Sequence, residues 1–353
     1  MKKLLNYLLI LTFILFLSAC GGGEEDTSGA GEESDSSETS DETTEETDEG
    51  SGETIIWKMG HLSNEDHQWH KTAEKFAELV SEKTDGQLQI EIYPNEQLGS
   101  ETEVLNGIGA GTVDMTISGE TMQNWAPEAA LMAVPYAFTG QEHLQSIVEG
   151  DIGTEIEEAI KEGVGVTPLY YHIRAPRNLT SNDPIESPED LDGFKMRVPN
   201  VPLFMDVWEA AGARPQVMDF SEVFTGLQQG VIDGQENPVD LILSGSLSEV
   251  QDYVNVTEHV YSWIYVVVGN DQFNELSEEM QTAVQEAAEE AQTFGLDLYE
   301  TETADIEQEL KDQGMEFVEV DQEAFAEAMQ EAVQESLTDE QLELYEKIQE
   351  AAK

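Results

Sequence analysis

The chain has 353 residues, of which 75 are acidic and 15 basic, and its net charge is −60 at pH 7. This charge argues against nucleic acid or an anionic membrane face as a partner, because like charges repel. The single cysteine excludes an internal disulfide bond, so the folded part must be held together by its core.

The first 20 residues have the pattern of a bacterial export signal. Lys2 and Lys3 precede an apolar run over 4–17, which is too short to span a bilayer comfortably. The run is followed by the letters LSAC, which resemble the lipobox of bacterial lipoproteins. We predict a lipoprotein signal peptide over 1–19 and lipidation of Cys20. The alternative is an ordinary secretory signal with a chance cysteine.

The next segment is a highly acidic tether. Residues 21–53 contain 14 acidic residues and no basic ones, and the rest are Gly, Ser, Thr and Ala. Such a sequence has no apolar area to offset the entropy of ordering it. We predict that 20–53 is a lipidated, disordered tether, which holds an extracytoplasmic domain at the outer face of the cell membrane.

From Thr54 onward, apolar positions alternate between strand and helix spacing. This alternation predicts two α/β lobes with mostly parallel sheets. The stretch 231–238 (VIDGQENP) reads as a turn. Strands are expected at 54–62, 88–94, 113–118, 164–173, 194–199, 213–218, 259–270 and 314–320, and helices at 67–84, 101–111, 202–212, 220–230, 277–312, 322–335 and 338–352.

The long helix from 277 crosses both predicted lobes, which favours a cleft that closes on a small molecule. We assign 54–174 plus about 263–302 to lobe I. We assign 175–262 plus the C-terminal helices, about 303–353, to lobe II.

The four arginines gather in one region, at Arg174, Arg177, Arg197 and Arg214. A guanidinium group matches a carboxylate in a bidentate fashion and keeps its charge. For Arg214 we expect an ion pair with a nearby acid. The surroundings of Arg177 and Arg197 favour a ligand role.

Several stretches together resemble one family. They are KMRVPN (195–200), FSEVFTGLQQGVIDGQENP (220–238), EIYPNEQLGSETEVLNGIGAGTVDMTIS (91–118) and PEAALMAVPYAF (127–138). The chain is similar from about Thr54 onward to the DctP-type solute-binding proteins of tripartite ATP-independent periplasmic (TRAP) transporters.

The resemblance implies a periplasmic-binding-protein-like α/β fold of two lobes, joined by strands and a long helix, with the ligand between them. It implies capture of an organic acid anion, a sugar acid or a dicarboxylate, and its delivery to the membrane subunits of the transporter. It implies no enzymatic activity.

The resemblance also implies a set of binding residues. Arg197 matches the arginine that forms a salt bridge with the ligand carboxylate, and Arg177 matches a second arginine at the site. Asn237 matches an asparagine that hydrogen-bonds the ligand, Phe220 an aromatic residue that packs against it, and Asn200 a polar neighbour of Arg197. Glu120 and His61 match positions where some members of the family contact the ligand.

Charge chemistry supports this assignment. A carboxylate in a closed cleft loses water and needs a charge-assisted partner, which two arginines supply. If the cleft closes without the anion, the two arginines come together with no negative charge to compensate them. The bound anion therefore favours the closed form. Trp125, Tyr171, His172 and Trp263 are further candidates for shaping a pocket for a hydroxylated acid, or else belong to the core.

Three other functions are alternatives. Asp233 and Glu236 are an alternative acid/base pair of a glycoside hydrolase, although residues three apart on one turn diverge. His67 and His70 are an alternative metal pair, but no third ligand accompanies them, so solvated helix residues are the expectation. A ligand-sensing receptor is indistinguishable from a transport protein at this level. The sequence has no nucleotide-binding glycine motif and no zinc spacing, so we predict neither a cofactor nor a metal.

Overall fold

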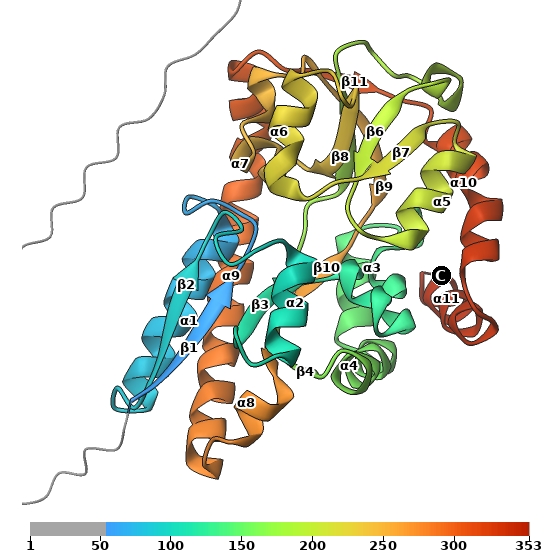
Figure 1. Ribbon diagram of the computed structural model, residues 1–353. Coiled ribbons are helices and arrows are strands. Elements are labelled where there is room, and N and C mark those ends of the chain that lie inside the picture. Colours follow the sequence, from blue (N-terminus) through green and yellow to red (C-terminus); the bar gives the residue numbers. More distant parts are fainter. Residues whose placement is uncertain (1–53, 353) are drawn as a thin grey trace, which may run out of the picture. The chain divides into compact units, whose positions relative to one another are not determined.

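Two β-sheets form the framework of residues 54–352, the part of the chain that the structure, a computed structural model, describes (Figure 1). The predicted signal peptide, the lipidation of Cys20 and the tether lie outside the described residues. Among residues 54–352, no helix combines the length and the apolar character that crossing a membrane requires.

The first sheet has the order β2-β1-β3-β10-β4. β1 is parallel to β2 and β3, whereas β10 is antiparallel to β3 and β4. Every residue of β10 is buried, which confirms the apolar strand predicted near its position. The strands are β1 (Ile55–Gly60), β2 (Leu88–Tyr93), β3 (Met115–Ser118), β4 (Val166–Ile173) and β10 (Trp263–Gly269).

The second sheet has the order β11-β9-β5-β8-β6-β7. It is mixed, because β5 runs antiparallel to both β8 and β9. The prediction of mostly parallel sheets is therefore wrong at β5 and β10. The chain enters each of these strands directly from the other sheet, without the crossover helix that parallel pairing requires. The strands are β5 (Arg177–Ser181), β6 (Lys195–Val198), β7 (Arg214–Val217), β8 (Gly234–Pro238), β9 (Tyr253–Val260) and β11 (Glu316–Glu319).

Helices cover both sheets, and several of them begin with a side-chain cap. α1 buries Trp69, Phe76 and Val80, and α2 begins with a capping box at Ser100. The helices are α1 (Gln68–Lys83), α2 (Glu101–Gly109), α3 (Gln141–Val148), α4 (Asp151–Gly163), α5 (Pro202–Ala210), α6 (Phe220–Gln228), α7 (Val239–Ser244), α8 (Asn270–Asn274), α9 (Glu278–Asp312), α10 (Gln322–Ser336) and α11 (Asp339–Ala351). Short 3-10 turns lie at η1 (Glu120–Asn124), η2 (Pro127–Ala133), η3 (Pro188–Leu191) and η4 (Leu247–Glu249).

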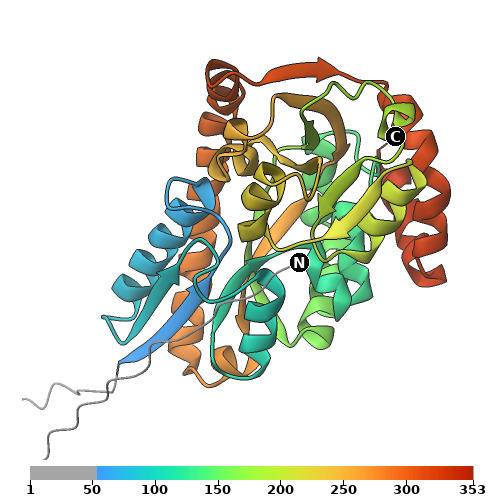
Figure 2. The same ribbon diagram turned by 45° about the horizontal axis from the view of Figure 1, so that its top comes forward.

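The long helix α9 confirms the prediction for 277–312. The side chain of Ser277 caps its first turn. α9 packs against α1 and β4 beside the first sheet and against α7 beside the second. Figure 2 shows the blue helix α1 alongside α9.

The two C-terminal helices pack on different layers. α10 packs on α5 and β9 of the second sheet's layer, but α11 packs against α3 and η2 of the first. The backbone oxygen of Ile348 lies 2.9 Å from Nε2 of His143, and Gln341 donates to the backbone oxygen of Pro127. The amphipathic pattern of 338–352 predicts a helix but does not identify the surface that it covers.

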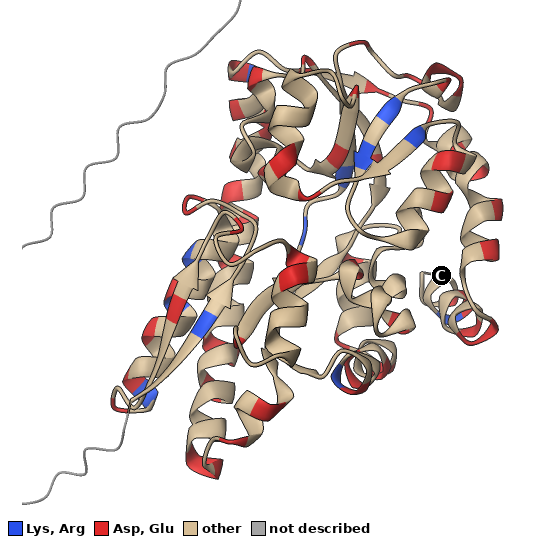
Figure 3. Ribbon diagram, viewed as in Figure 1, with Lys and Arg blue, Asp and Glu red and all other residues tan. Residues whose placement is uncertain are grey.

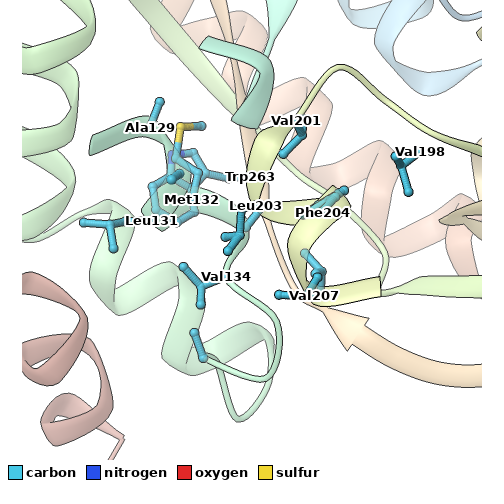
Figure 4. Close-up of a cluster of buried hydrophobic side chains, with 14 of the residues drawn as sticks. Ala129, Leu131, Met132, Val134, Val198, Val201, Leu203, Phe204, Val207 and Trp263 are labelled. Carbon is cyan, nitrogen blue, oxygen red and sulfur yellow. The ribbon is translucent and has the colours of Figure 1, made fainter. Parts of the chain in front are cut away.

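A buried apolar cluster connects the two layers. Figure 4 shows part of it, with Met132 and Val134 from η2 and the following residue, Phe204 and Val207 from α5, and Trp263 from β10. Helices of both layers therefore contribute to this cluster, whereas α1 and the first half of α9 pack in a second cluster against the first sheet.

The stretch predicted as a turn, 231–238, contains a central strand. All five residues of β8 are buried between β5 and β6. Its polar side chains hide this from sequence, but they have partners: Gln235 Nε2 donates to Thr180 Oγ1 at 3.1 Å. At Gly234, a Cβ atom would lie 2.1 Å from the backbone oxygen of Thr180, so the close pairing requires glycine.

Candidate functional site

A cavity lies between the two sheets, with an empty volume of about 630 Å³ that includes its open mouth. The first sheet contributes the end of β3 and the start of η1. The second sheet contributes β6 and β8, together with the segment from β7 into α6. The cavity is lined by Leu62, Trp69, Glu96, Glu101, Thr102, Ile117, Ser118, Gly119, Glu120, Thr121, Arg174, Arg177, Arg197, Pro199, Asn200, Met218, Asp219, Phe220, Asn237, Leu241 and Ile264.

Arg197 is a buried cation in the cavity wall. Its Nε donates to the backbone oxygen of Met218 at 2.7 Å, and its guanidinium carbon lies 5.9 Å from the centre of the Phe220 ring. Of the arginines, only Arg174 and Arg177 form ion pairs within residues 54–352. Burial lowers the pKa of Arg197 to about 10, and the Arg177 guanidinium adds to this shift while Glu236 opposes it. Arg197 is therefore poised to gain from an anion in the cavity.

Arg177, in contrast, is held by the protein's own acids. Its Nε and Nη2 donate to the two carboxylate oxygens of Glu236 at 2.5 and 2.7 Å, and Nη1 lies 3.5 Å from Glu120. His259 Nε2 lies 3.0 Å from the same Glu236 carboxylate. Burial raises the pKa of Glu236, but Arg177 and His259 outweigh it and bring the value down to about 2. Arg177 lines the cavity, yet its charge is already compensated.

Glu120 lies on the opposite wall, at the start of η1. Both of its carboxylate oxygens accept from Arg174 Nη1, at 2.9 and 3.1 Å. Burial raises the pKa of Glu120, but Arg174 and Arg177 together hold it below its ordinary value. Nearby, burial raises the pKa of Glu101, which accepts from Ser118 Oγ at 2.5 Å. This wall thus presents carboxylate oxygens, which accept hydrogen bonds from hydroxyl groups.

The cavity also includes the other three residues expected from the second lobe. Phe220 begins α6, and Asn237 lies on β8, where its Nδ2 donates to Gln235 Oε1. Asn200 lies at the mouth, where its backbone oxygen accepts from Asn124 Nδ2 at 2.8 Å. The structure therefore brings six of the seven expected binding residues together.

His61 is the exception. It is buried and does not line the cavity; its ring instead contacts His70 and Ser63, each at 3.0 Å. His61 directly follows β1, and this position turns its ring toward α1. Trp125, Tyr171, His172 and Trp263 do not line the cavity either; the aromatic residue that does so beside Arg174 is Trp69.

The alternative sites are not assembled. Glu236 is buried in its ion pair, whereas Asp233 accepts from the backbone of Lys195. His67 and His70 are buried rather than solvated, because α1 packs with that face inward and His67 lies 3.3 Å from Asp240. Within residues 54–352, no group of three or more potential ligands is placed to hold a metal ion.

Arg214 also differs from expectation. It is exposed on the edge strand β7 and takes part in none of the ion pairs among residues 54–352. Basic positions on β6 and β7 stand out against acidic positions spread over the helices in Figure 3. An exposed guanidinium group remains hydrated and gains little from pairing.

Sequence reasoning missed several cavity residues, notably Glu96, Glu101 and Trp69. Glu101 and Glu96 sit within the quoted family stretch 91–118, but nothing in their spacing separates them from the many surface acids. Only the fold shows that they face the cavity.

Buried histidines make the stability of the fold sensitive to pH. Burial, with neighbouring histidines adding to the effect, lowers the pKa of His61 to about 3, and burial lowers that of His172 to about 3. The unfolded chain binds these protons below about pH 6.5, whereas the folded chain resists them until about pH 3. We expect the free energy of unfolding to fall from pH 6.5 toward 3, by on the order of 1 kcal/mol per histidine and pH unit. Calorimetric melting of wild type and His172→Gln tests this: the variant should show a shallower pH dependence, and an identical slope would contradict the assignment.

Comparison with known proteins agrees with this geometry. The family model for bacterial extracellular solute-binding proteins, family 7 (DctP), matches residues 59–340. Solute-binding protein RD1_1052 of Roseobacter denitrificans is 53% identical over 283 residues, which are 80% of this chain and 87% of the relative. The 2,3-diketo-L-gulonate-binding periplasmic protein YiaO of Escherichia coli is 32% identical, covering 77% of this chain and 84% of its own.

A solved structure is similar over the same region. The crystal structure of a TRAP periplasmic solute-binding protein from Roseobacter denitrificans, with bound L-galactonate, has 51% sequence identity and a TM-score of 0.82. The match covers 83% of this chain and 98% of that structure.

Two sheets enclose a cavity, and Arg197 in its wall has no ion-pair partner among residues 54–352. Together with the similar structures, this architecture is that of a two-lobed solute-binding protein of the TRAP type. The chain belongs to family 7 of the bacterial extracellular solute-binding proteins, the DctP family. It is therefore an extracytoplasmic binding protein, and the family is one of ligand capture rather than catalysis.

Proposed function

We propose that the protein captures a polyhydroxylated monocarboxylate, an aldonate of the L-galactonate type, and delivers it to the membrane subunits of a TRAP transporter. The observation that carries this is Arg197, a buried guanidinium group in the cavity wall that forms no ion pair within residues 54–352. A sugar-acid carboxylate supplies the missing charge, with Asn237 beside it as a directional hydrogen-bonding amide.

The opposite wall supports a hydroxylated cargo over a plain dicarboxylate. Glu101 and Glu120 line that wall, and Ser118 and Thr121 add hydroxyl groups. The carboxyl oxygens accept hydrogen bonds from sugar hydroxyls, which a plain dicarboxylate lacks. The ligand names of two relatives, L-galactonate and 2,3-diketo-L-gulonate, belong to the same chemical class.

A thermal-shift and calorimetry panel tests the cargo. We expect L-galactonate to raise the melting temperature by several degrees, since a ligand at 1,000 times its Kd adds about 4 kcal/mol to stability. Succinate should shift it little. The matched control is L-galactono-1,4-lactone, which keeps the carbon skeleton and loses the carboxylate. A lactone that binds as tightly as the acid would contradict the role of Arg197.

We also propose that Cys20 carries a lipid and that residues 21–53 tether the folded part to the membrane. The support is the order of charged, apolar and small residues before the only cysteine. Mass spectrometry of protein from membranes should find an N-terminal peptide that begins at a lipid-modified Cys20, and Cys20→Ser should release the protein from the membrane fraction. An unmodified peptide that begins elsewhere would contradict the anchor.

A further inference from the structure

The rim of the cavity is bridged by direct hydrogen bonds between the two lobes. Glu96, in the loop after β2, accepts from the backbone N–H of Ser221 in α6 at 3.0 Å. Asn124 and Thr102 of the first lobe contact Asn200 of the second at 2.8 and 3.4 Å. The bond of Glu96 joins a charged side chain of one lobe to a backbone N–H in the first turn of a helix in the other.

That helix end lacks a cap of its own. α6 has nine residues, and its N-cap, Asp219, makes no side-chain hydrogen bond to the first turn. The first N–H groups of a helix have no partner within the helix, and an acceptor there stabilises it. Ser221 is the second residue of α6, so Glu96 supplies from the first lobe the acceptor that a local N-cap usually provides.

The backbone beside Glu96 is held in an unusual conformation. Asn95 and Glu96 both have φ of 55°, a left-handed conformation that asparagine adopts more readily than most residues and glutamate rarely adopts. The turn is fixed to the first lobe, because the N–H of Asn95 donates to Ser63 and that of Glu96 to His61. Strained residues persist where the surrounding structure holds them, and they concentrate at functional sites.

We propose that Glu96 is the positioning residue that couples ligand capture to lobe closure, by capping α6 only when the lobes meet. The cap lies at the proposed ligand site, because Glu96 and Phe220, the first residue of α6, both line the cavity. A separation of the lobes by a few ångströms breaks a bond of 3.0 Å and leaves the first turn of α6 open to water. The inference rests on the proposed function in that closure is measured through a bound sugar acid.

The charge of Glu96 and its role as a cap predict opposite effects on ligand affinity when Glu96 is replaced. Glu96 is an acid in the wall of an anion site, so removal of its charge by itself strengthens the binding of a carboxylate. Loss of the cap weakens the closed form. Glu96→Ala removes charge and cap together, whereas Glu96→Gln removes the charge and keeps an acceptor of the same reach.

Calorimetry and stopped-flow kinetics with L-galactonate separate these effects. We expect Glu96→Ala to raise Kd by about 2- to 30-fold, the range for one lost helix cap, through faster dissociation. Glu96→Gln should bind at least as tightly as wild type. Glu222→Ala, an exposed acid in the same first turn, is the matched control and should leave Kd unchanged. Binding by Glu96→Ala as tight as wild type would overturn the proposal, and so would an equal loss in the Gln variant.

Hydrogen exchange at the amide of Ser221 reports on the cap directly. A role of Glu96 in general stability alone would not change how strongly the ligand slows this exchange. Ligand should slow this exchange in wild type and in Glu96→Gln, and should slow it far less in Glu96→Ala, while later turns of α6 behave alike in all three. Equal protection at Ser221 in the Ala variant would overturn the proposal. A wild type that fails to bind L-galactonate contradicts the proposed cargo instead, so the two failures are distinct.

Discussion

Arg197→Ala should abolish binding of the sugar acid, with an increase in Kd of at least about 100-fold. The reason is that a carboxylate in the closed cavity loses its water and meets no other guanidinium group with a free charge. Removal of one partner of a buried charged pair costs about 3–5 kcal/mol, or more than two orders of magnitude in affinity. Calorimetry of the purified variant with L-galactonate measures the loss.

The control for this prediction is Arg214→Ala, which removes the same group from the exposed edge strand of the same sheet. It should bind like wild type, which excludes a general effect of net charge. The ligand-free melting temperature of Arg197→Ala should stay close to that of wild type, because Arg197 forms no ion pair within residues 54–352. A variant that binds with unchanged affinity would contradict the assignment.

Arg177→Met should destabilise the fold itself, by about 3–5 kcal/mol. The substitution leaves the Glu236 carboxylate buried without the guanidinium group that compensates it. Urea unfolding without ligand measures this loss. The double variant Arg177→Met/Glu236→Leu removes both charges and should recover most of the stability.

This prediction separates two roles for Arg177. The family resemblance implies a direct ligand contact, whereas the geometry gives it a structural pairing with Glu236 and His259. An Arg177→Met variant as stable as wild type but unable to bind L-galactonate would contradict the structural role and support the direct contact.

Sequence patterns predicted the elements well wherever apolar spacing was strong. The helices at 67–84 and 277–312 and the strand near 263–269 are examples, since burial of one face or of a whole strand leaves a clear period. The strand β8 was not predicted because its residues, Gly, Gln, Glu, Asn and Pro, are typical of turns rather than of buried strands. Its burial depends on partners that lie more than fifty positions away, such as Thr180 and Arg177.

The same limit applies to the site. Arg177 and Arg197 look alike in sequence, yet within residues 54–352 only Arg177 has a carboxylate partner, because the fold brings Glu236 to it across 59 positions. His61 was misplaced for a related reason: its neighbour His70 is close in sequence, but the turn between them decides which way the ring faces. The family motifs located the cavity, and the three-dimensional pairing of charges assigned the roles.

A crystal structure of the protein with bound L-galactonate will show whether Arg197 holds the carboxylate of the cargo. We predict two hydrogen bonds from the Arg197 guanidinium group to the ligand carboxylate, with Arg177 still paired to Glu236. A carboxylate bound elsewhere, with Arg197 turned away or paired to an acid of the protein, would rule out this role for Arg197.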